Sequence, residues 1–199
     1  ITMSVSIDDI KKLKELTGIG LTDAKVALVD AGGDFDKALE ALRKKGLTKA
    51  DKKSDREARE GIIDSYVHGG RIGVLVEVNC ETDFVARTDG FKEFAHLIAL
   101  QIASMAPTYI SEADIPAAEM ERVRAEAKEK VIADGKPADM ADKIVDGQVK
   151  KHFAEKVLLN QSYIMDDSMT VETFLKENIG KMGENIIIRQ FKRIELGVK

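Results

Sequence analysis

The residues of this chain that could carry covalent chemistry are few and scattered. Cys80 is the single cysteine among 199 residues, and His68, His96 and His152 stand apart, at no spacing that metal ligands use. A single cysteine forms no intrachain disulfide and fits a reducing compartment. Asp83 alone makes no catalytic pair of carboxylates. We therefore expect neither a metal centre nor a cofactor.

The sequence also lacks the short motifs of common enzymes. The patterns GxSxG, GxxxxGK[ST], HExxH and CxxC are absent, and "GGRIG" at residues 69–73 falls inside an expected hairpin, where its glycines serve the turn. We expect a protein that is not an enzyme. One alternative stays open, a small hydrolase that uses Cys80 or His68, and it requires the thiol to be exposed.

The overall composition is that of an ordinary folded protein. Hydrophobic residues make up 44% and charged residues 33%, whereas disordered chains are poorer in apolar residues. The formal net charge is −4, with both signs interleaved, so no basic face is offered to nucleic acid. The longest charge-poor stretch, "FAHLIALQIASMA", is shorter than the roughly 20 residues of a membrane span, and no signal peptide is recognisable. We expect a cytoplasmic protein that binds neither nucleic acid nor membrane directly.

The first fifty residues predict an N-terminal module of three short helices, residues 1–50. Ser6, Thr22 and Asp34 are each suited to cap a helix, and the glycines of "TGIG", of "GG" and at position 46 are suited to end one. Residues 51–60 are almost wholly charged or small, which is typical of a solvated linker. The remaining residues, 61–199, are expected to form a core domain.

Residues 61–80 alternate with the period of two that strands show. If Gly69 and Gly70 form a two-residue loop, His68 lies opposite Arg71 and the pairing of the whole hairpin follows. The expected core face consists of Ile63, Val67, Ile72, Val74, Val76, Val78 and Cys80. The expected outer face consists of Asp64, Tyr66, Arg71, Leu75, Glu77 and Asn79. In this register Cys80 is a small core residue.

The rest of the core domain predicts helices around a sheet. A helix capped by Asp89 is expected to cover the hairpin, since a hairpin alone is marginally stable. Its apolar stripe consists of Phe91, Phe94, Ala95, Ile98, Ile102 and Met105. Residues 116–160, entered at Pro116 and broken at "DGKP", predict a helical hairpin.

A last helix and a third strand complete the expected fold. "MTVETFLKENIG" predicts a helix capped at Thr170, and "ENIIIRQFKRIEL" predicts a β-branched strand. This strand lies far in sequence from the hairpin but needs partners, so we expect it in the same sheet. The predicted fold class is α+β, with a three-stranded antiparallel sheet.

Two long segments resemble the signature segments of the elongation factor Ts family, the guanine-nucleotide exchange factors of elongation factor Tu. They are "LKELTGIGLTDAKVAL", residues 13–28, and "EVNCETDFVAR", residues 77–87. The first departs from the usual family residues at Ala24, where Cys is common, and at Lys14, where Arg is usual. "GGRIGVLVEVN", "DGKP", "MTVETFLKENIGKMGENI" and "IRQFKRIEL" occur in the family's order, so the resemblance covers essentially the whole chain. The N-terminal module is similar to ubiquitin-associated three-helix domains.

The resemblance implies an exchange factor with two groups of partner-binding residues. The group that would insert into the G domain of elongation factor Tu and disturb its Mg²⁺ and GDP phosphate site consists of Thr82, Asp83, Phe84 and Val85. The group that would contact the same G domain near its phosphate loop consists of Leu21, Thr22 and Lys25. Short relatives with a single such core can pair, so the resemblance also implies a homodimer. A second alternative is an adapter that uses the N-terminal module to bind ubiquitin-like proteins or peptides.

Overall fold

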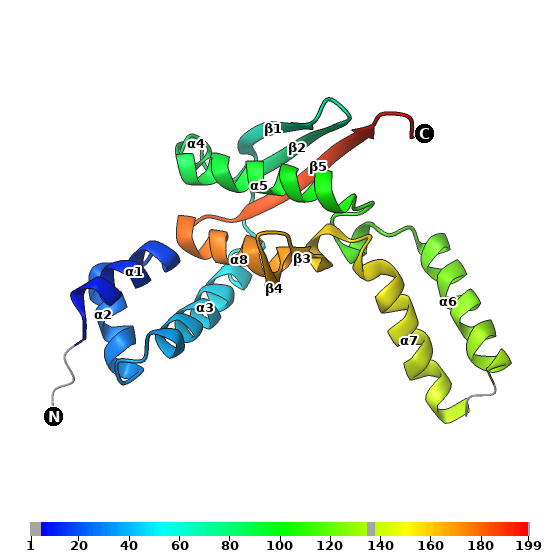
Figure 1. Ribbon diagram of the computed structural model, residues 1–199, viewed down its shortest axis with the longest axis horizontal. Coiled ribbons are helices and arrows are strands. Elements are labelled where there is room, and N and C mark those ends of the chain that lie inside the picture. The colour runs from blue at the N-terminus through cyan, green and yellow to red at the C-terminus, as the bar shows by residue number, and fades with distance from the viewer. Residues whose placement is uncertain (1–4, 135–137, 199) are drawn as a thin grey trace. The chain divides into compact units, whose positions relative to one another are not determined.

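The computed structural model describes residues 5–134 and 138–198, and it begins with three helices (Figure 1). They are α1, Ile7–Thr17, α2, Leu21–Asp30, and α3, Phe35–Asp51. Their shared core holds the buried side chains of Leu13, Ala24, Leu28 and Ala38. Ser6 caps α1 and Asp34 caps α3, both through side-chain oxygens, as the sequence predicts.

Two details of this N-terminal module differ from the prediction. Gly20, not Thr22, is the N-cap of α2, so Thr22 lies inside the first helical turn. Gly46 does not end α3, which continues to Asp51. A glycine inside a helix costs only about 1 kcal/mol, and the Gly46 backbone here lies against Gly180, whose Cβ position would be 3.4 Å from the Gly46 Cα. A Cβ on Gly46 itself would meet nothing within 4 Å, so this glycine is tolerated in the helix and is not required by its packing.

The charged segment after α3 is less solvated than its composition suggests. Ala58 is fully buried, and the Nδ2 of Asn185 donates hydrogen bonds to the backbone oxygens of Ser54 and Arg56, at 3.3 and 2.7 Å. The Nζ of Lys53 donates to the Gly183 oxygen at 2.5 Å. This segment is therefore held by its backbone and by the Lys53 side chain, while most of its other charged side chains are exposed. The predicted domain boundary at 51–60 remains a prediction about independent folding.

A three-stranded antiparallel sheet follows, as predicted. Its strands are β1, Glu60–His68, β2, Ile72–Cys80, and β5, Ile186–Glu195, in the order β1-β2-β5. The long C-terminal strand thus joins the hairpin beside β2. In β2 the expected core residues Val74, Val76, Val78 and Cys80 are buried, and Ile72 is half-buried. Asn79, expected on the outer face, is also buried, and its side chain is hydrogen-bonded to the Glu60 backbone oxygen and to the Arg189 Nε.

The predicted register of the β1–β2 hairpin is wrong for β1. Three residues, not two, separate the strands, because Arg71 belongs to the turn with Gly69 and Gly70. A shift of one residue turns every side chain of a strand to the opposite face. Accordingly Ile63 and Val67 are 72% and 68% exposed instead of buried. Glycine repeats predict a turn but do not fix its length.

The long helix α5 lies along the sheet (Figure 1). α5 spans Asp89–Met105, and its first half reaches β1 through a 3.0 Å hydrogen bond between the His96 ring and Asp64. Its predicted stripe is buried, except for Met105, which is 42% exposed near the end of the helix. The Thr88 hydroxyl accepts the Phe91 N–H at 3.3 Å, so Thr88, rather than Asp89, caps this helix.

Two helices form the predicted hairpin (Figure 1). α6 spans Ala117–Ala133 and α7 spans Ala138–Ala154. The apolar spacing of the sequence assigns to their shared face Met120, Val123, Ala127, Val131, Val145, Val149, Phe153 and Val157. All of these are buried in one cluster with Ile115 except Met120, which is partly buried, and Val157 lies beyond the end of α7. The last three residues of the predicted "DGKP" break lie outside the described residues.

Short elements link these parts. A two-stranded sheet of β3, Ser162–Tyr163, and β4, Asp166–Thr170, is not predicted by the sequence, because neither strand is long enough to show alternation. Two 3₁₀ turns, Glu112–Asp114 and Leu158–Asn160, flank the helical hairpin. The last helix, α8, spans Val171–Met182 and directly precedes β5.

The described residues group into two compact units. The first runs to Ser65 and also holds Leu75–Ile98 and Thr173–Phe191. The second holds Tyr66–Val74, Ala99–Glu172 and the residues from Lys192 onward. No helix in the described part of the chain is long and apolar enough to cross a membrane.

Candidate functional site

Phe84 is the most exposed aromatic side chain that the structure describes, at 81%. It lies on α4, Asp83–Ala86, a single helical turn between the end of β2 and the start of α5. Exposing a Phe forgoes about 1.5–3 kcal/mol of burial free energy. A large apolar ring presented to solvent by a short, well-anchored element is typical of an interaction site.

The residues next to Phe84 hold α4 in place. Thr82 is the N-cap, and its Oγ1 accepts the Val85 N–H at 3.4 Å. An ion pair of 2.9 Å joins Arg87 to Asp83 one turn apart, and Ala86 is buried beneath them. Thr82, Asp83 and Val85 are all partly buried. Within the predicted group Phe84 is therefore the exposed member, and its neighbours support the turn.

Cys80 is buried at the end of β2 and is poorly suited to catalysis. Burial raises the pKa of its thiol to about 11, and the nearby Glu184 carboxylate adds to this rise. The Sγ lies 3.1 Å from the Thr82 backbone oxygen, to which it donates. A nucleophilic cysteine needs a lowered pKa and access to solvent. Cys80 is therefore unsuited to be the nucleophile of the hydrolase alternative.

Thiol labelling checks this conclusion. At pH 7.5 we expect the folded protein to react with a disulfide reagent at least about a hundredfold more slowly than the unfolded chain, because thiolate is the reactive form and the site is closed. Rapid labelling of the folded protein, at the rate seen in denaturant, would contradict it.

The three histidines each contact a different neighbour. The Nδ1 of His68 lies 3.0 Å from the Tyr66 hydroxyl, that of His96 lies 3.0 Å from Asp64, and the Nε2 of His152 lies 3.1 Å from the Lys156 Nζ. Within residues 5–134 and 138–198, His, Cys, Asp and Glu side chains form no group of three that could hold a metal ion. The side chain that His68 contacts within the hairpin is that of Tyr66, not a cysteine or a serine.

The second predicted group lies on α2. Leu21 is 51% exposed at the first position of the helix, Thr22 is exposed in the same turn, and Lys25 is exposed one turn further on. Leu21 is thus a surface residue, not a core residue of the N-terminal module. The same helix also exposes Val26 and Val29. The helical periodicity of the sequence does not predict that these two residues lie at the surface.

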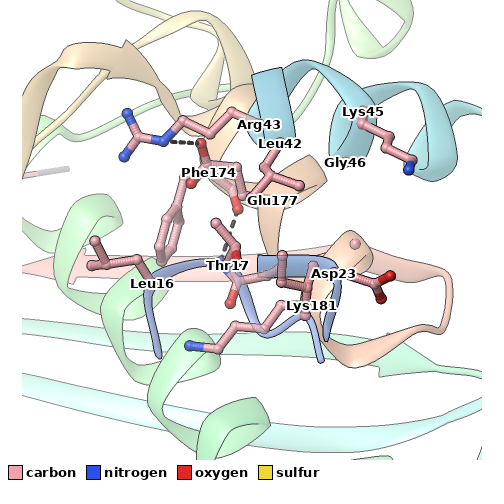
Figure 2. A pocket seen from close by; sticks show the side chains of 13 residues that line it. Leu16, Thr17, Asp23, Leu42, Arg43, Lys45, Gly46, Phe174, Glu177 and Lys181 are labelled. Carbon is pink, nitrogen blue, oxygen red and sulfur yellow. Dashed lines mark hydrogen bonds and ion pairs between the residues drawn. The ribbon is translucent and has the colours of Figure 1, made fainter. Parts of the chain in front are cut away.

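A cavity of about 310 Å³ opens between the N-terminal helices and α8 (Figure 2). Its polar centre is the ion pair of the Arg43 Nε and Glu177 Oε1, 3.1 Å apart, with Phe174 and Leu16 nearby. Neither histidine nor cysteine lines it. The Glu177 carboxylate is matched by the Arg43 guanidinium, and the lining also includes Asp23, Lys45 and Lys181.

Comparisons with known proteins identify relatives of this chain. A family model described as "Elongation factor TS" matches residues 46–198. An elongation factor Ts of Thermoanaerobacter sp. (strain X514) is 51% identical over 194 residues, covering 97% of this chain and 95% of that protein. Those of Herpetosiphon aurantiacus and Geobacter sp. (strain M21) are 47% and 48% identical over 196 residues, covering 98% of this chain and 99% and 91% of theirs.

These matches define a class of protein, the translation elongation factors. Within that class, the chain belongs to the elongation factor Ts family.

Proposed function

We propose that this chain binds GDP-bound elongation factor Tu and promotes release of GDP by disturbing the site that holds Mg²⁺ and the phosphates. The observation that carries the proposal is the 81% exposed Phe84 on the capped turn α4, in a chain of the elongation factor Ts family. Phe84 and its neighbours Thr82, Asp83 and Val85 would enter the G domain of the partner.

The target site is sensitive to small displacements. Mg²⁺ requires near-ideal octahedral geometry and takes few protein ligands. A phosphate cradle depends on backbone N–H groups aimed at the oxygens. An aromatic ring that shifts the supporting helix would therefore weaken the metal and the phosphate contacts together.

Phe84 alone supplies only part of the required coupling. Burying one Phe contributes about 1.5–3 kcal/mol, which corresponds to roughly a ten- to hundredfold change in nucleotide affinity if all of it becomes coupling. A second contact by Leu21, Thr22 and Lys25 on α2 would add affinity and orient the factor. Their exposure on one helix supports this role.

The proposed cycle needs no bond chemistry by this chain. Coupling between two ligands is reciprocal, so a factor that weakens GDP binding is itself bound more weakly when GDP or GTP returns. The nucleotide therefore displaces the factor, which becomes free for another cycle. We accordingly propose a cytoplasmic binding protein that is not an enzyme.

The direct test follows a fluorescent GDP analogue bound to elongation factor Tu during a chase with unlabelled GDP. We expect release to accelerate when this protein is added. An unchanged release rate at concentrations where the two proteins form a complex would contradict the proposal.

The second contact can be tested with a double variant, Leu21→Ala with Lys25→Ala. We expect about tenfold weaker binding of nucleotide-free elongation factor Tu, which corresponds to a joint contribution of about 1.4 kcal/mol from the two side chains. The thermal melt should be unchanged because both side chains are at the surface. Calorimetric titration measures the affinity, and Lys11→Ala on α1 serves as the matched surface control. Full affinity in the double variant would remove α2 from the interface.

The adapter alternative makes a different prediction. It uses the N-terminal module and gives Phe84 no role. A pull-down that recovers ubiquitin-like proteins and no translational GTPase would favour it. Recovery of elongation factor Tu, lost in the Phe84→Ala variant, would favour exchange.

The proposal also includes a homodimer. Light scattering or sedimentation gives the mass directly, and we expect twice the 21.9 kDa of one chain. A monomer at micromolar concentration would reject the proposed homodimer and leave the proposed exchange function intact.

A further inference from the structure

The TDFV segment, residues 82–85, is fastened to the start of β5 by two glutamates. The Oε2 of Glu184 accepts the backbone N–H groups of Glu81 and Thr82, at 3.1 and 3.0 Å. Its Oε1 accepts the Thr82 hydroxyl at 2.6 Å. In return, the Glu81 Oε1 accepts the Asn185 N–H at 2.7 Å and lies 3.5 Å from the Arg56 Nη1. We call these reciprocal contacts the Glu81–Glu184 clasp.

The clasp continues into α4 through Thr82. The Thr82 Oγ1 donates to Glu184 and at the same time accepts the Val85 N–H, the cap of α4. The two oxygens of the Glu184 carboxylate together accept all three hydrogen bonds from residues 81 and 82, and such charge-assisted bonds are stronger than neutral ones. Glu184 therefore fixes both the backbone entering α4 and the hydroxyl that caps it.

A turn as short as α4 needs such support. One helical turn is unstable by itself, because it fixes several backbone dihedrals for very few hydrogen bonds. Phe84 is 81% exposed, so its ring receives little support from packing. The direction in which Phe84 points thus depends on the cap, and the cap depends on Glu184.

We propose that Glu184 is a positioning residue for nucleotide exchange, which acts by holding Thr82 and α4 so that Phe84 enters the partner already oriented. This inference rests on the proposed function. An oriented side chain loses less conformational freedom on binding, and small misplacements of an acting group are costly. Glu184 itself needs no contact with the partner.

A double-mutant cycle tests the inference. Glu184→Ala should lower kcat/KM for GDP release about ten- to hundredfold in the otherwise unchanged protein. In the Phe84→Ala background the same change should alter the rate by no more than about twofold, because the residue acts through Phe84. Losses that multiply in the double variant would overturn the proposal. Glu93→Ala, an exposed glutamate of α5, is the matched control and should keep full activity.

Two milder variants guard against a misfolded Glu184→Ala. Glu184→Gln keeps a carbonyl oxygen for the two backbone N–H groups, so it should retain more exchange activity than Glu184→Ala. Thr82→Val removes only the hydroxyl and should lose activity without adding to the loss from Glu184→Ala. Equal activity of Glu184→Ala, Glu184→Gln and the unchanged protein would overturn the proposal.

A measurement without the partner separates this inference from the proposed function. Amide hydrogen exchange of Thr82 and Val85 should become at least about tenfold faster in Glu184→Ala, while the amides of α6 keep their protection. Unchanged protection at Thr82 and Val85 would overturn the clasp as a positioning device. Failure of the unchanged protein to release GDP would instead reject the proposed function.

Discussion

Replacing Phe84 with alanine should slow factor-dependent GDP release by about ten- to hundredfold, the range that burial of one Phe side chain in a partner can supply. The thermal melt should stay the same, because Phe84 is 81% exposed and its ring contributes little to the folded chain. Stopped-flow release of a fluorescent GDP analogue from elongation factor Tu measures the rate, and calorimetry measures the melt.

The matched control removes another exposed apolar side chain. Ile132→Ala on α6 deletes a residue that is 65% exposed and should leave both the exchange rate and the melt unchanged. A Phe84→Ala variant with a full exchange rate would show that the exposed ring is not used. A large loss of stability in that variant would show that Phe84 supports the core.

Replacing Phe91 with alanine should have the opposite pattern. Phe91 lies seven positions further along the chain, in the first turns of α5, and is completely buried. Phe to Ala changes in a core cost about 3–5 kcal/mol of unfolding free energy, which lowers the melting temperature of a chain of this size by about 6–20 °C. Chemical denaturation and calorimetry measure the loss.

The exchange rate distinguishes the two phenylalanines. Below its melting temperature, Phe91→Ala should retain most of its exchange activity per folded molecule, since its ring faces the core. A stable Phe91→Ala protein that has lost exchange would mean that the two rings act together. The pair therefore separates a binding role from a packing role with the same substitution.

Helical periodicity predicted much of this fold correctly. The predicted shared faces of α6 and α7 agree with the buried cluster around Val149 and Phe153 at every position but Met120, which is partly buried. The caps at Ser6 and Asp34 are also correct. These features depend on residues three or four positions apart, so the local sequence contains all that is needed.

Features that depend on turn length or on distant residues could not be predicted in this way. One extra residue in the turn after His68 reversed the two faces of β1. Glu184 was not singled out as a site residue, because its contacts reach Glu81 and Thr82 about one hundred positions earlier in the chain. The segment "GENI" shows no local pattern that predicts such a clasp.

The residues of the candidate site were likewise predicted only in part from local sequence patterns. The strand pattern placed Cys80 in the core, and it is fully buried. That Phe84 would lie on an exposed turn came from the resemblance of "EVNCETDFVAR" to a known family, since periodicity stops at Thr82. The structure adds the cap, the clasp and the exposure of the ring.

The proposed exchange activity is measured most directly as GDP release under turnover conditions, with this protein far below the concentration of elongation factor Tu. We expect a substoichiometric amount to release all of the bound fluorescent GDP in the presence of unlabelled GDP, at a rate proportional to the amount of factor. We also expect Phe84→Ala to lower this rate. Release at the spontaneous rate, or release that stops at one equivalent of the factor, would contradict the proposed exchange activity.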